Sequence, residues 1–597
     1  MRIPSALAGT FAATLALSMS PMAHAAIYRI GSGAGCTHAT IQAAIDAAVA
    51  TAEGDEIRLG ATQYNVSTLS IGATDGPLTV SGGYASCLAT SPAAGQRAVL
   101  IGNGSGSVVR VRNVQTLQLA NLDIRQGSAT EGGGIDVQGS PSATDIDVVA
   151  LSNTLVRSNG ALRGGGIGVK NTLGTNAQPG NLQVLLYGDS SVTSNTATDD
   201  GGGIRCEHAT VMLFDRSHVG LNTSSEGAGG GIHGLDCRLQ LTSRGVSGNG
   251  AVLWSNSAPA GLGGGMFLRG SQASVDIMTI DAIVPARIVG NSALAGGGIG
   301  VNDAAQVRLY DTILQQNSAA AYGGAILVSN GSGVGQSRLS MLHADAGSPS
   351  AAVACADAEA CNLVRSNRVD PGTGPFGRAG AGFIAFASAP DRVRVDFRGT
   401  RFDFNDGTTL AHLDGSGARA VFNGALLVDN LSTDGLIFAQ GGGHAIDVSS
   451  STLASNSLGE GNAVIRAAGA CSASGGLQVR HSIVWQPQRA LVEPTAAIDP
   501  ACFSHLISAD FGVLPAAADR VVADPLFLAA ASGNFQVFSA SPALDFAPPR
   551  ATDATRDGAP RVMDLADRTD RFGPQDVGAY ERFEDRLFKN GFDCETC

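Results

Sequence analysis

Six charged or histidine residues between positions 170 and 236 could act on an acidic sugar. They are Lys170, Arg205, Glu207, His208, His233 and Asp236. Arginine pairs with a carboxylate through two parallel hydrogen bonds, so these residues could grip a carboxylated polysaccharide. Elimination on a uronic acid would further need a base and charge neutralisation, which Arg205, Lys170 or a bound calcium ion could supply. The simpler interpretation, which we prefer, is a solvated surface with ordinary ion pairs.

These residues lie together in space only if the chain is built from repeats. A Gly-Gly-Gly-Ile phrase, or a close variant, returns at 132–135, 164–167, 201–204, 229–232, 263–266, 296–299 and 323–326. An asparagine comes five to seven residues before six of these phrases, at Asn159, Asn195, Asn222, Asn256, Asn291 and Asn317. A period of about thirty residues with loops of variable length is typical of a repeat protein.

The repeat predicts strands. Side chains alternate after each glycine phrase, as in Ile167 and Val169, which indicates a strand with one buried face. A second apolar segment, such as 154–156, precedes each phrase, and two or three short strands per repeat fit one rung of a parallel β-helix. A helical solenoid is excluded because each glycine costs a helix about 1 kcal/mol. We expect about eighteen rungs, stacked at about 4.8 Å.

Glycine and asparagine suit the corners of such a rung. Glycine allows positive φ and close backbone approach. Asparagine tolerates the left-handed conformation, and stacked asparagines could form ladders. If the isoleucine of each phrase points inward, the next residue points outward, which places Arg205 and His233 in register. Lys170 and Glu207 follow two positions later, with His208 and Asp236 close by.

The asparagine phrase followed by the glycine phrase resembles the repeat of polymorphic outer-membrane proteins. That resemblance implies an all-β fold, a single-stranded right-handed parallel β-helix (solenoid) of the pectin-lyase-like type. In that family the asparagine phrase commonly begins with Phe, whereas Leu, Ile or Val usually stands there in this chain. Residues 40–48 look like the N-terminal capping helix common in such folds, and 524–581 resemble the C-terminal end of secreted bacterial β-helix proteins.

These features predict five segments. They are a signal peptide at 1–25, a cap with the first rungs at 26–100, β-helix rungs at 101–520, a closing segment at 521–581 and a charged, Cys-containing tail at 582–597. The first segment has Arg2, an apolar run and an Ala-His-Ala cleavage site, so we expect export to the medium, cell surface or outer membrane. We expect no membrane-spanning segment in the mature chain.

Ten cysteines in an exported chain indicate disulfides. Neighbours are expected to pair: Cys36 with Cys87, Cys206 with Cys237, Cys355 with Cys361, Cys471 with Cys502, and Cys594 with Cys597. The second pair is separated by 31 residues, about one repeat, and adjacent rungs lie within disulfide reach. We expect no metal site, because the terminal Cys-x-x-Cys has no second ligand pair.

The net charge of −13 argues against nucleic acid as a partner. The chain lacks the Arg-rich phrase of pectate lyases and the full motif set of polygalacturonases, of which Asp199-Asp200 and Gly443-His444 match fragments only. We therefore expect a monomer without cofactor that binds a polysaccharide or a cell-surface partner. The alternatives are a polysaccharide lyase or glycoside hydrolase, with calcium expected only for the lyase, and a structural envelope spacer.

Overall fold

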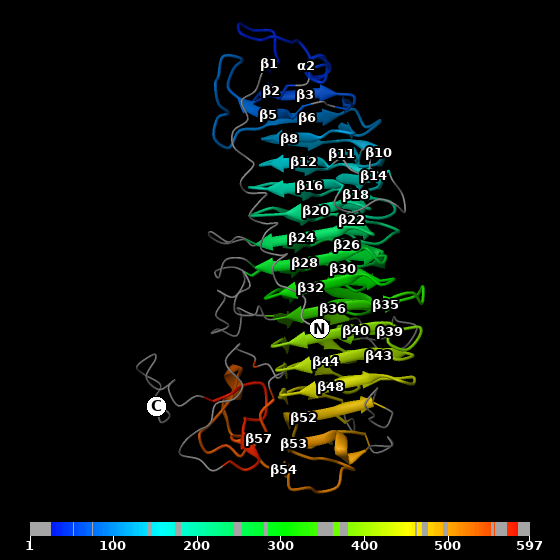
Figure 1. The fold of residues 1–597 in the computed structure, drawn as a ribbon, viewed down its shortest axis with the longest axis vertical. Helices are drawn as coiled ribbons and strands as arrows, with labels where there is room; N and C mark the ends of the chain where they lie inside the picture. Colours follow the sequence, from blue (N-terminus) through cyan, green and yellow to red (C-terminus); the bar gives the residue numbers. More distant parts are fainter. Residues whose placement is uncertain are drawn as a thin grey trace.

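The computed structural model describes residues 26–51, 53–73, 76–139, 146–172, 181–243, 252–279, 285–342, 362–369, 380–459, 463–467, 476–493, 499–550, 555 and 570–582. In this part the chain winds as a parallel β-helix, in which strands of successive turns pair side by side (Figure 1). The α-helix of this part, α2 (Ile41–Ala48), lies at the N-terminal end of the stack. The predicted all-β parallel β-helix with a short capping helix is confirmed.

Each turn visits three parallel sheets, which we call sheets I, II and III. Sheet I contains β4 (Leu69–Ile71), β7 (Val109–Arg112), β11 (Ile135–Gln138), β15 (Ile167–Lys170), β19 (Ile204–Glu207), β23 (Ile232–Leu235), β27 (Met266–Arg269), β31 (Ile299–Asn302), β35 (Ile326–Asn330), β39 (Gly380–Ala387), β43 (Thr409–Gly415), β47 (Ile437–Ala439) and β51 (Ile465–Ala467). The glycine phrases lead directly into strands of this sheet.

Sheet II receives two consecutive strands from most turns. The first series is β1 (Ile27–Arg29), β2 (Asp55–Gly60), β5 (Leu78–Tyr84), β8 (Thr116–Ala120), β12 (Asp147–Ser152), β16 (Leu182–Tyr187), β20 (Thr210–Leu213), β24 (Arg238–Ser243), β28 (Ser274–Thr279), β32 (Gln306–Tyr310), β36 (Ser337–Leu342), β40 (Val393–Arg398), β44 (Arg419–Asn423), β48 (Ala445–Ser449), β52 (Gly476–Trp485), β53 (Phe503–Ser508) and β54 (Arg520–Val522). The second series is β3 (Gln63–Val66), β6 (Ala98–Gly102), β9 (Leu122–Arg125), β13 (Leu155–Arg157), β17 (Ser191–Thr193), β21 (His218–Gly220), β25 (Val252–Trp254), β29 (Arg287–Val289), β33 (Ile313–Gln315), β37 (Leu363–Arg365), β41 (Arg401–Asp403), β45 (Leu426–Val428) and β49 (Thr452–Ala454).

Sheet III completes the turn before the next glycine phrase. It contains β10 (Ser128–Glu131), β14 (Gly160–Arg163), β18 (Thr196–Ala197), β22 (Thr223–Ser224), β26 (Ser257–Leu262), β30 (Ser292–Ala295), β34 (Ser318–Tyr322), β38 (Arg368–Val369), β42 (Asp406–Gly407), β46 (Leu431–Ser432) and β50 (Ser457–Leu458). A full turn thus has four strands instead of two or three. In the described part sheet I has 13 strands and the first series of sheet II has 17, against about eighteen rungs expected.

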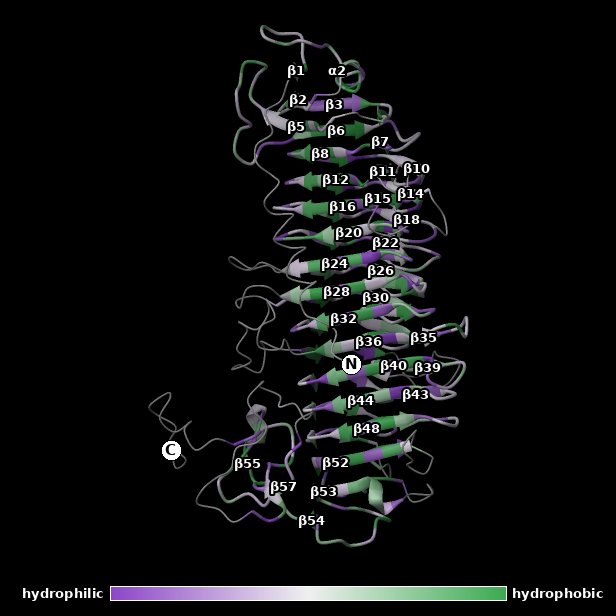
Figure 2. Cartoon of the chain, in the orientation of Figure 1, coloured by the Kyte–Doolittle hydropathy of each residue, from purple (hydrophilic) through white to green (hydrophobic). Residues whose placement is uncertain are grey.

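The core is a narrow column of apolar side chains inside the turns. The isoleucines that end the glycine phrases stack in register, as Ile167, Ile204 and Ile232 do, and each is fully buried. Burying such a side chain contributes roughly 1.5–3 kcal/mol. Figure 2 shows hydrophobic and hydrophilic stretches alternating along the strands, as expected for walls with one inner and one outer face.

The glycine phrase is required by the corner from sheet III to sheet I. Its first glycine has positive φ, for example +70° at Gly201. A Cβ added at the second, Gly202, would overlap the carbonyl oxygen of Gly230 in the next turn. An alanine would be strained at the first position and blocked at the second, so the phrase is fixed by backbone geometry.

A buried asparagine ladder runs along the corner from sheet II to sheet III. Its members are Asn159, Asn195, Asn222, Asn256, Asn291, Asn317, Asn367, Asn405, Asn430 and Asn456. The Nδ2 of Asn195 donates to Oδ1 of Asn222 at 3.0 Å and to the Val156 carbonyl at 2.9 Å. The left-handed residue at this corner precedes the asparagine, as at Ser194 with φ of 55°. The ladder asparagines therefore do not use their tolerance of the left-handed conformation at this corner, whereas the expected ladder is present.

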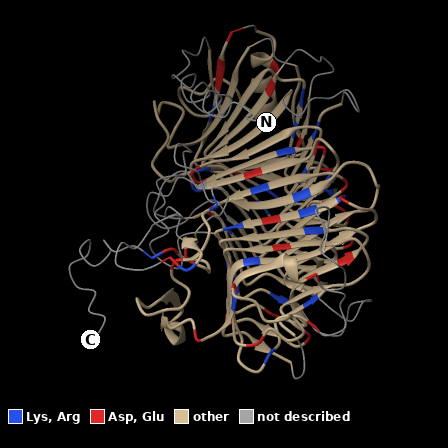
Figure 3. Cartoon of the chain, turned by 60° about the horizontal axis from the view of Figure 1, so that its bottom comes forward, with Lys and Arg blue, Asp and Glu red and all other residues tan. Residues whose placement is uncertain are grey.

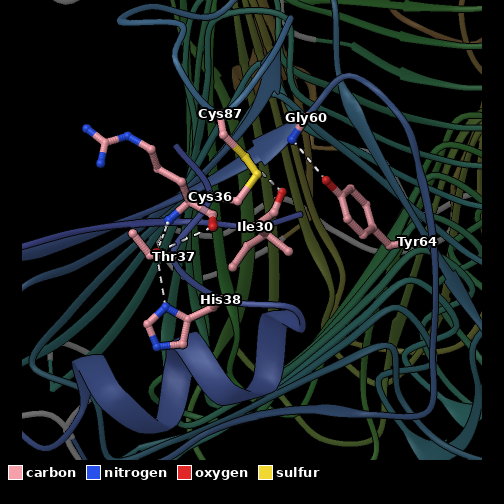
Figure 4. The surroundings of a disulfide bond; sticks show 8 residues. Ile30, Cys36, Thr37, His38, Gly60, Tyr64 and Cys87 are labelled. Carbon is pink, nitrogen blue, oxygen red and sulfur yellow. Dashed lines mark hydrogen bonds between the residues drawn. A yellow bond between two sulfur atoms is a disulfide. The ribbon is translucent and has the colours of Figure 1, made fainter. Parts of the chain in front are cut away.

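The N-terminal cap covers the first turn. Helix α2 buries Ile41, Ala44, Ile45 and Ala48, and its N-cap Thr40 accepts a hydrogen bond from the Ala43 backbone. The disulfide between Cys36 and Cys87 ties the cap to the turn after β5 (Figure 4). This helix supplies the apolar lid that an open first turn needs.

The closing segment folds back along the outside of the last turns. Its hairpin of β55 (Phe527–Ala529) and β56 (Asn534–Val537) packs against sheet II, where Phe535 is buried with Leu426 and Val428 (Figure 1). The parallel pair β57 (Phe546–Ala547) and β58 (Gly573–Pro574) follows, and Phe546 packs against Ile483 and Ile507. The segment therefore covers one side of the rod.

The predicted Cys206–Cys237 disulfide is present, with a Cα–Cα distance of 5.9 Å, as is Cys36–Cys87 at 5.1 Å. Cys502 is also disulfide-bonded. Its expected partner Cys471, the pairs Cys355–Cys361 and Cys594–Cys597, the signal peptide at 1–25 and nearly all of the tail at 582–597 lie outside the described residues. Within the described ranges, no helix is long and apolar enough to cross a membrane.

Candidate functional site

Arg205 and His233 of the predicted strip lie where sheets III and I meet, and we call this edge the corner groove. One wall is the row of outward residues in sheet I, which contains Arg110, Asp136, Gly168, Arg205, His233, Phe267, Gly300 and Leu327. The other wall is the row that immediately precedes each glycine phrase, with Glu131, Arg163, Asp200, Ala228, Leu262, Ala295 and Tyr322. Charged residues fill the first turns of both rows, and apolar residues fill the later turns.

The register predicted for the strip agrees with the strand pairing. Arg205 lies beside His233, and Lys170 lies beside Glu207. Arg205 is 2.8 Å from a Glu207 carboxylate oxygen, and Lys170 is 3.2 Å from the other one. Both cations of the strip therefore share Glu207, and Arg205 also lies 3.6 Å from a Glu131 carboxylate oxygen. These contacts with carboxylates of the protein weaken the idea that the two cations grip an acidic polysaccharide.

His208 and Asp236 lie apart from this cluster, at the bend from sheet I to sheet II. Both have positive φ, 52° and 47°. The Asp236 carboxylate accepts a hydrogen bond from the backbone N–H of Gln272 at 2.9 Å. Asp236 thus shapes a turn, and the structure does not bring these two residues into the ion-pair cluster around Glu207.

His233 is buried although it belongs to the outward row. Its ring stacks on Phe267 at 5.6 Å, and its Nε2 lies 3.7 Å from the Asp200 carboxylate. Burial lowers the pKa of His233 to about 4, against the opposing attraction of Asp200. The imidazole is therefore neutral near pH 7 and carries no charge for an anionic ligand.

Sequence reasoning missed the acidic partner on the opposite wall. Glu131 lies 3.0 Å from Arg163 and 3.6 Å from Arg205, so it bridges two turns. The available signal was position, because Glu131, Arg163 and Asp200 each immediately precede a glycine phrase. Asp136 was expected to point outward but was not assigned to the strip, and it pairs with Arg112 and with Arg110 at 3.9 Å.

A cleft of about 460 Å³ opens at the polar end of the corner groove. It is lined by Ser105, Gly106, Ser107, Arg110, Ser128, Ala129, Thr130, Glu131, Asp136 and Gln138. The lining combines hydroxyl, amide and carboxylate groups with one guanidinium, and the Arg110 side chain is 46% exposed. Such a surface can donate and accept hydrogen bonds at several points.

The two glutamates of the cluster differ in protonation behaviour. Burial raises the pKa of Glu131, and this effect outweighs the lowering by Arg205, Arg163 and Lys170. Burial acts in the same direction on Glu207, but the charges and hydrogen bonds of Arg205 and Lys170 prevail and lower its pKa. Glu131 therefore holds a proton more readily than Glu207, and it is the one that faces the cleft.

Within the described ranges, no group of three or more His, Cys, Asp or Glu side chains is arranged to hold a metal ion. No protein-family model matches the chain, and a comparison with curated proteins finds no match.

Proposed function

We propose that the protein is an exported β-helix that binds a carbohydrate in the cleft of the corner groove without transforming it. The observation that carries this proposal is the lining of the cleft, in which three serines, a threonine and a glutamine accompany Arg110, Glu131 and Asp136. Sugar hydroxyls donate and accept hydrogen bonds, so they can pair with the exposed members of this lining, which are Ser105, Arg110, Ser128 and Thr130. The shape of the rod alone would support many functions.

The expected ligand is neutral. Asp136 already binds Arg112, and Glu207 already binds Arg205 and Lys170, so few positive charges remain for an acidic sugar. Arg110 is half exposed and can still donate to a sugar oxygen. Export is supported by the disulfides, which are typical of oxidising compartments, and by the apolar N-terminal segment. The repeat resembles that of polymorphic outer-membrane proteins, which favours the cell surface.

Calorimetric titration of the mature protein with a panel of neutral oligosaccharides tests the proposal. Arg110→Gln should weaken binding about tenfold, because a charge-assisted hydrogen bond contributes about 1.5–3 kcal/mol. Arg216→Gln is the matched control, since Arg216 is exposed, is ion-paired with Asp189 and lies away from the cleft. Failure of every oligosaccharide to bind, or equal binding by Arg110→Gln, would overturn the proposal.

Glycoside hydrolysis is the second candidate, and Glu131 favours it. A carboxyl with a raised pKa can donate a proton to a leaving group, while Asp136 in the same cleft is held by two arginines. Elimination is less favoured, because Arg205 and Lys170 are already paired with Glu207.

Product analysis separates the two candidates. Incubation with the oligosaccharide panel should release no new reducing ends if the protein only binds. Release that is lost in Glu131→Gln, with ligand affinity retained, would replace the binding proposal by hydrolysis. Acidic polysaccharides with calcium, followed by absorbance of unsaturated product, test the lyase alternative in the same way.

A further inference from the structure

A stack of three arginines lies on the outer face of sheet II, far along the chain from the cleft. Arg338 on β36, Arg394 on β40 and Arg419 on β44 are direct neighbours in the strand register. All three are partly exposed, because the alternate residues Val393, Val395 and Ala420 point into the core. Strand pairing therefore places one guanidinium side chain on each of three successive turns, at about 4.8 Å spacing.

Within the arginine stack, the Asp396 carboxylate forms ion pairs with two of the three arginines. Asp396 accepts from Arg338 at 2.6 Å and from Arg394 at 2.8 Å, so both neighbours share a single negative charge. Arg419 makes no ion pair with any described residue, and its Nε is buried without a hydrogen-bond partner. The nearest acidic residue on the next strand, Asp447, is bound by Arg480. The stack thus retains positive charge that the protein does not neutralise.

The surroundings add further positive charge. Arg392 immediately precedes β40 and the exposed Arg398 ends it, with Asp391 as the acidic residue of the turn before the strand. Figure 3 shows basic and acidic residues interleaved on neighbouring strands of the rod. Because the whole protein has a net charge of −13, long-range repulsion disfavours polyanions, and only a local cationic site can hold one.

We infer that the arginine stack is a second carbohydrate site, which binds a linear acidic polysaccharide running along the rod. A row of guanidinium groups with the period of the turns matches a chain with an anionic group on successive sugars. Arginine binds carboxylates and sulfates through paired N–H donors, so the contact depends on the orientation of the anionic group as well as on its charge. The site differs from the cleft in sheet and in chemistry, and the inference does not depend on the cleft binding a sugar.

Binding of polygalacturonate and dextran sulfate to the full-length mature protein tests the inference, with uncharged dextran as the reference polymer. The wild type should bind one or both acidic polymers, with affinity that falls as salt rises, and should not bind dextran. Arg419→Gln should weaken binding at least about tenfold, because it removes a charged donor and breaks no ion pair of the fold. Preference between the two polymers tells whether carboxylate or sulfate is recognised.

Arg216→Gln changes the net charge by the same amount at an exposed, ion-paired position and should bind as the wild type does. Arg110→Gln should also leave polygalacturonate binding unchanged, which separates this site from the cleft. Thermal unfolding of each variant checks that the fold is retained. Wild-type affinity in Arg419→Gln, an equal loss in Arg216→Gln, or equally tight binding of single-stranded DNA of matched charge would overturn the inference.

Discussion

Burial decides how the charged residues of the corner groove behave. Arg205 and His233 occupy the outward row of sheet I, yet their side chains are only 8% and 7% exposed, and Glu131 and Asp200 from the opposite wall lie against them. Buried charges persist only when they are paired, which explains the Glu131, Arg205 and Glu207 cluster. A histidine in the same place gives up its proton instead.

The first prediction concerns His233. Its folded pKa of about 4 lies below the ordinary value of 6.5, so its contribution to stability is complete above pH 6.5 and is lost as pH falls towards 4. His233→Leu removes this penalty, because leucine beside Phe267 binds no proton. The difference in melting temperature between pH 7 and pH 4.5 should therefore be smaller in the variant than in the wild type.

Scanning calorimetry across this pH range checks the result. His218→Leu is the control for loss of an imidazole ring, since His218 lies on the outer face of β21, away from the groove. If the melting temperature of His233→Leu depended on pH as that of the wild type does, burial would not lower the pKa of His233 in the way proposed.

The register of Arg205 with His233 was predictable, because the isoleucine of the glycine phrase fixes which neighbours point outward. The position of Glu131 before a glycine phrase was visible, but its contact with Arg205 was not predictable, since Glu131 belongs to another sheet and reaches Arg205 across two turns. Sequence spacing gives the alternation within a strand, but it does not give the angle between two sheets. The ion pairs, and hence the loss of free charge from the strip, follow from that angle.

At the scale of elements, different residue types form the two corners of the turn that adjoin sheet III. Glycine provides positive φ and close approach between sheets III and I, and asparagine provides continuous hydrogen bonding between sheets II and III. Six ladder asparagines were visible from the glycine phrases that follow them. The other four, Asn367, Asn405, Asn430 and Asn456, have no Gly-Gly-Gly-Ile phrase five to seven residues after them.

The second prediction concerns the ladder. Asn256 accepts from the backbone N–H and the Nδ2 of Asn222, and it donates to Asn291. Asn256→Ala leaves these buried groups without partners, so the variant should lose about 3 kcal/mol of unfolding free energy. Chemical denaturation measures the loss.

Asn65→Ala is the matched control, because Asn65 is exposed on β3 and lies outside the ladder. It should change stability by less than about 0.5 kcal/mol. A similar small effect in Asn256→Ala would mean that the ladder fixes the shape of the corner without stabilising it.

At the scale of the whole molecule, the two ends of the rod of stacked turns are covered in different ways. Helix α2 lies across the first turn, whereas the closing segment runs back over the side of the last ones. The closing residues Asp524 and Asp576 accept backbone hydrogen bonds within the segment, as expected for residues that shape turns. That this segment would fold back was not visible in the sequence, because its apolar residues show neither strand nor helix period.

The last prediction tests how stability is distributed along the rod. Phe535 is 1% exposed and packs on Leu426, Val428 and Ala454 of sheet II. Phe535→Ala should cost about 3–5 kcal/mol, since it opens a cavity between the segment and the rod. Each turn contacts mainly its neighbours, so the loss should be local, and hydrogen exchange should quicken in residues 523–550 and in β45 and β49. Strands β15 and β19 should exchange as in the wild type.

Phe404→Ala, at a side chain that is 55% exposed, should leave every region unchanged. Faster exchange along the entire rod in Phe535→Ala would mean that the turns unfold as one cooperative unit.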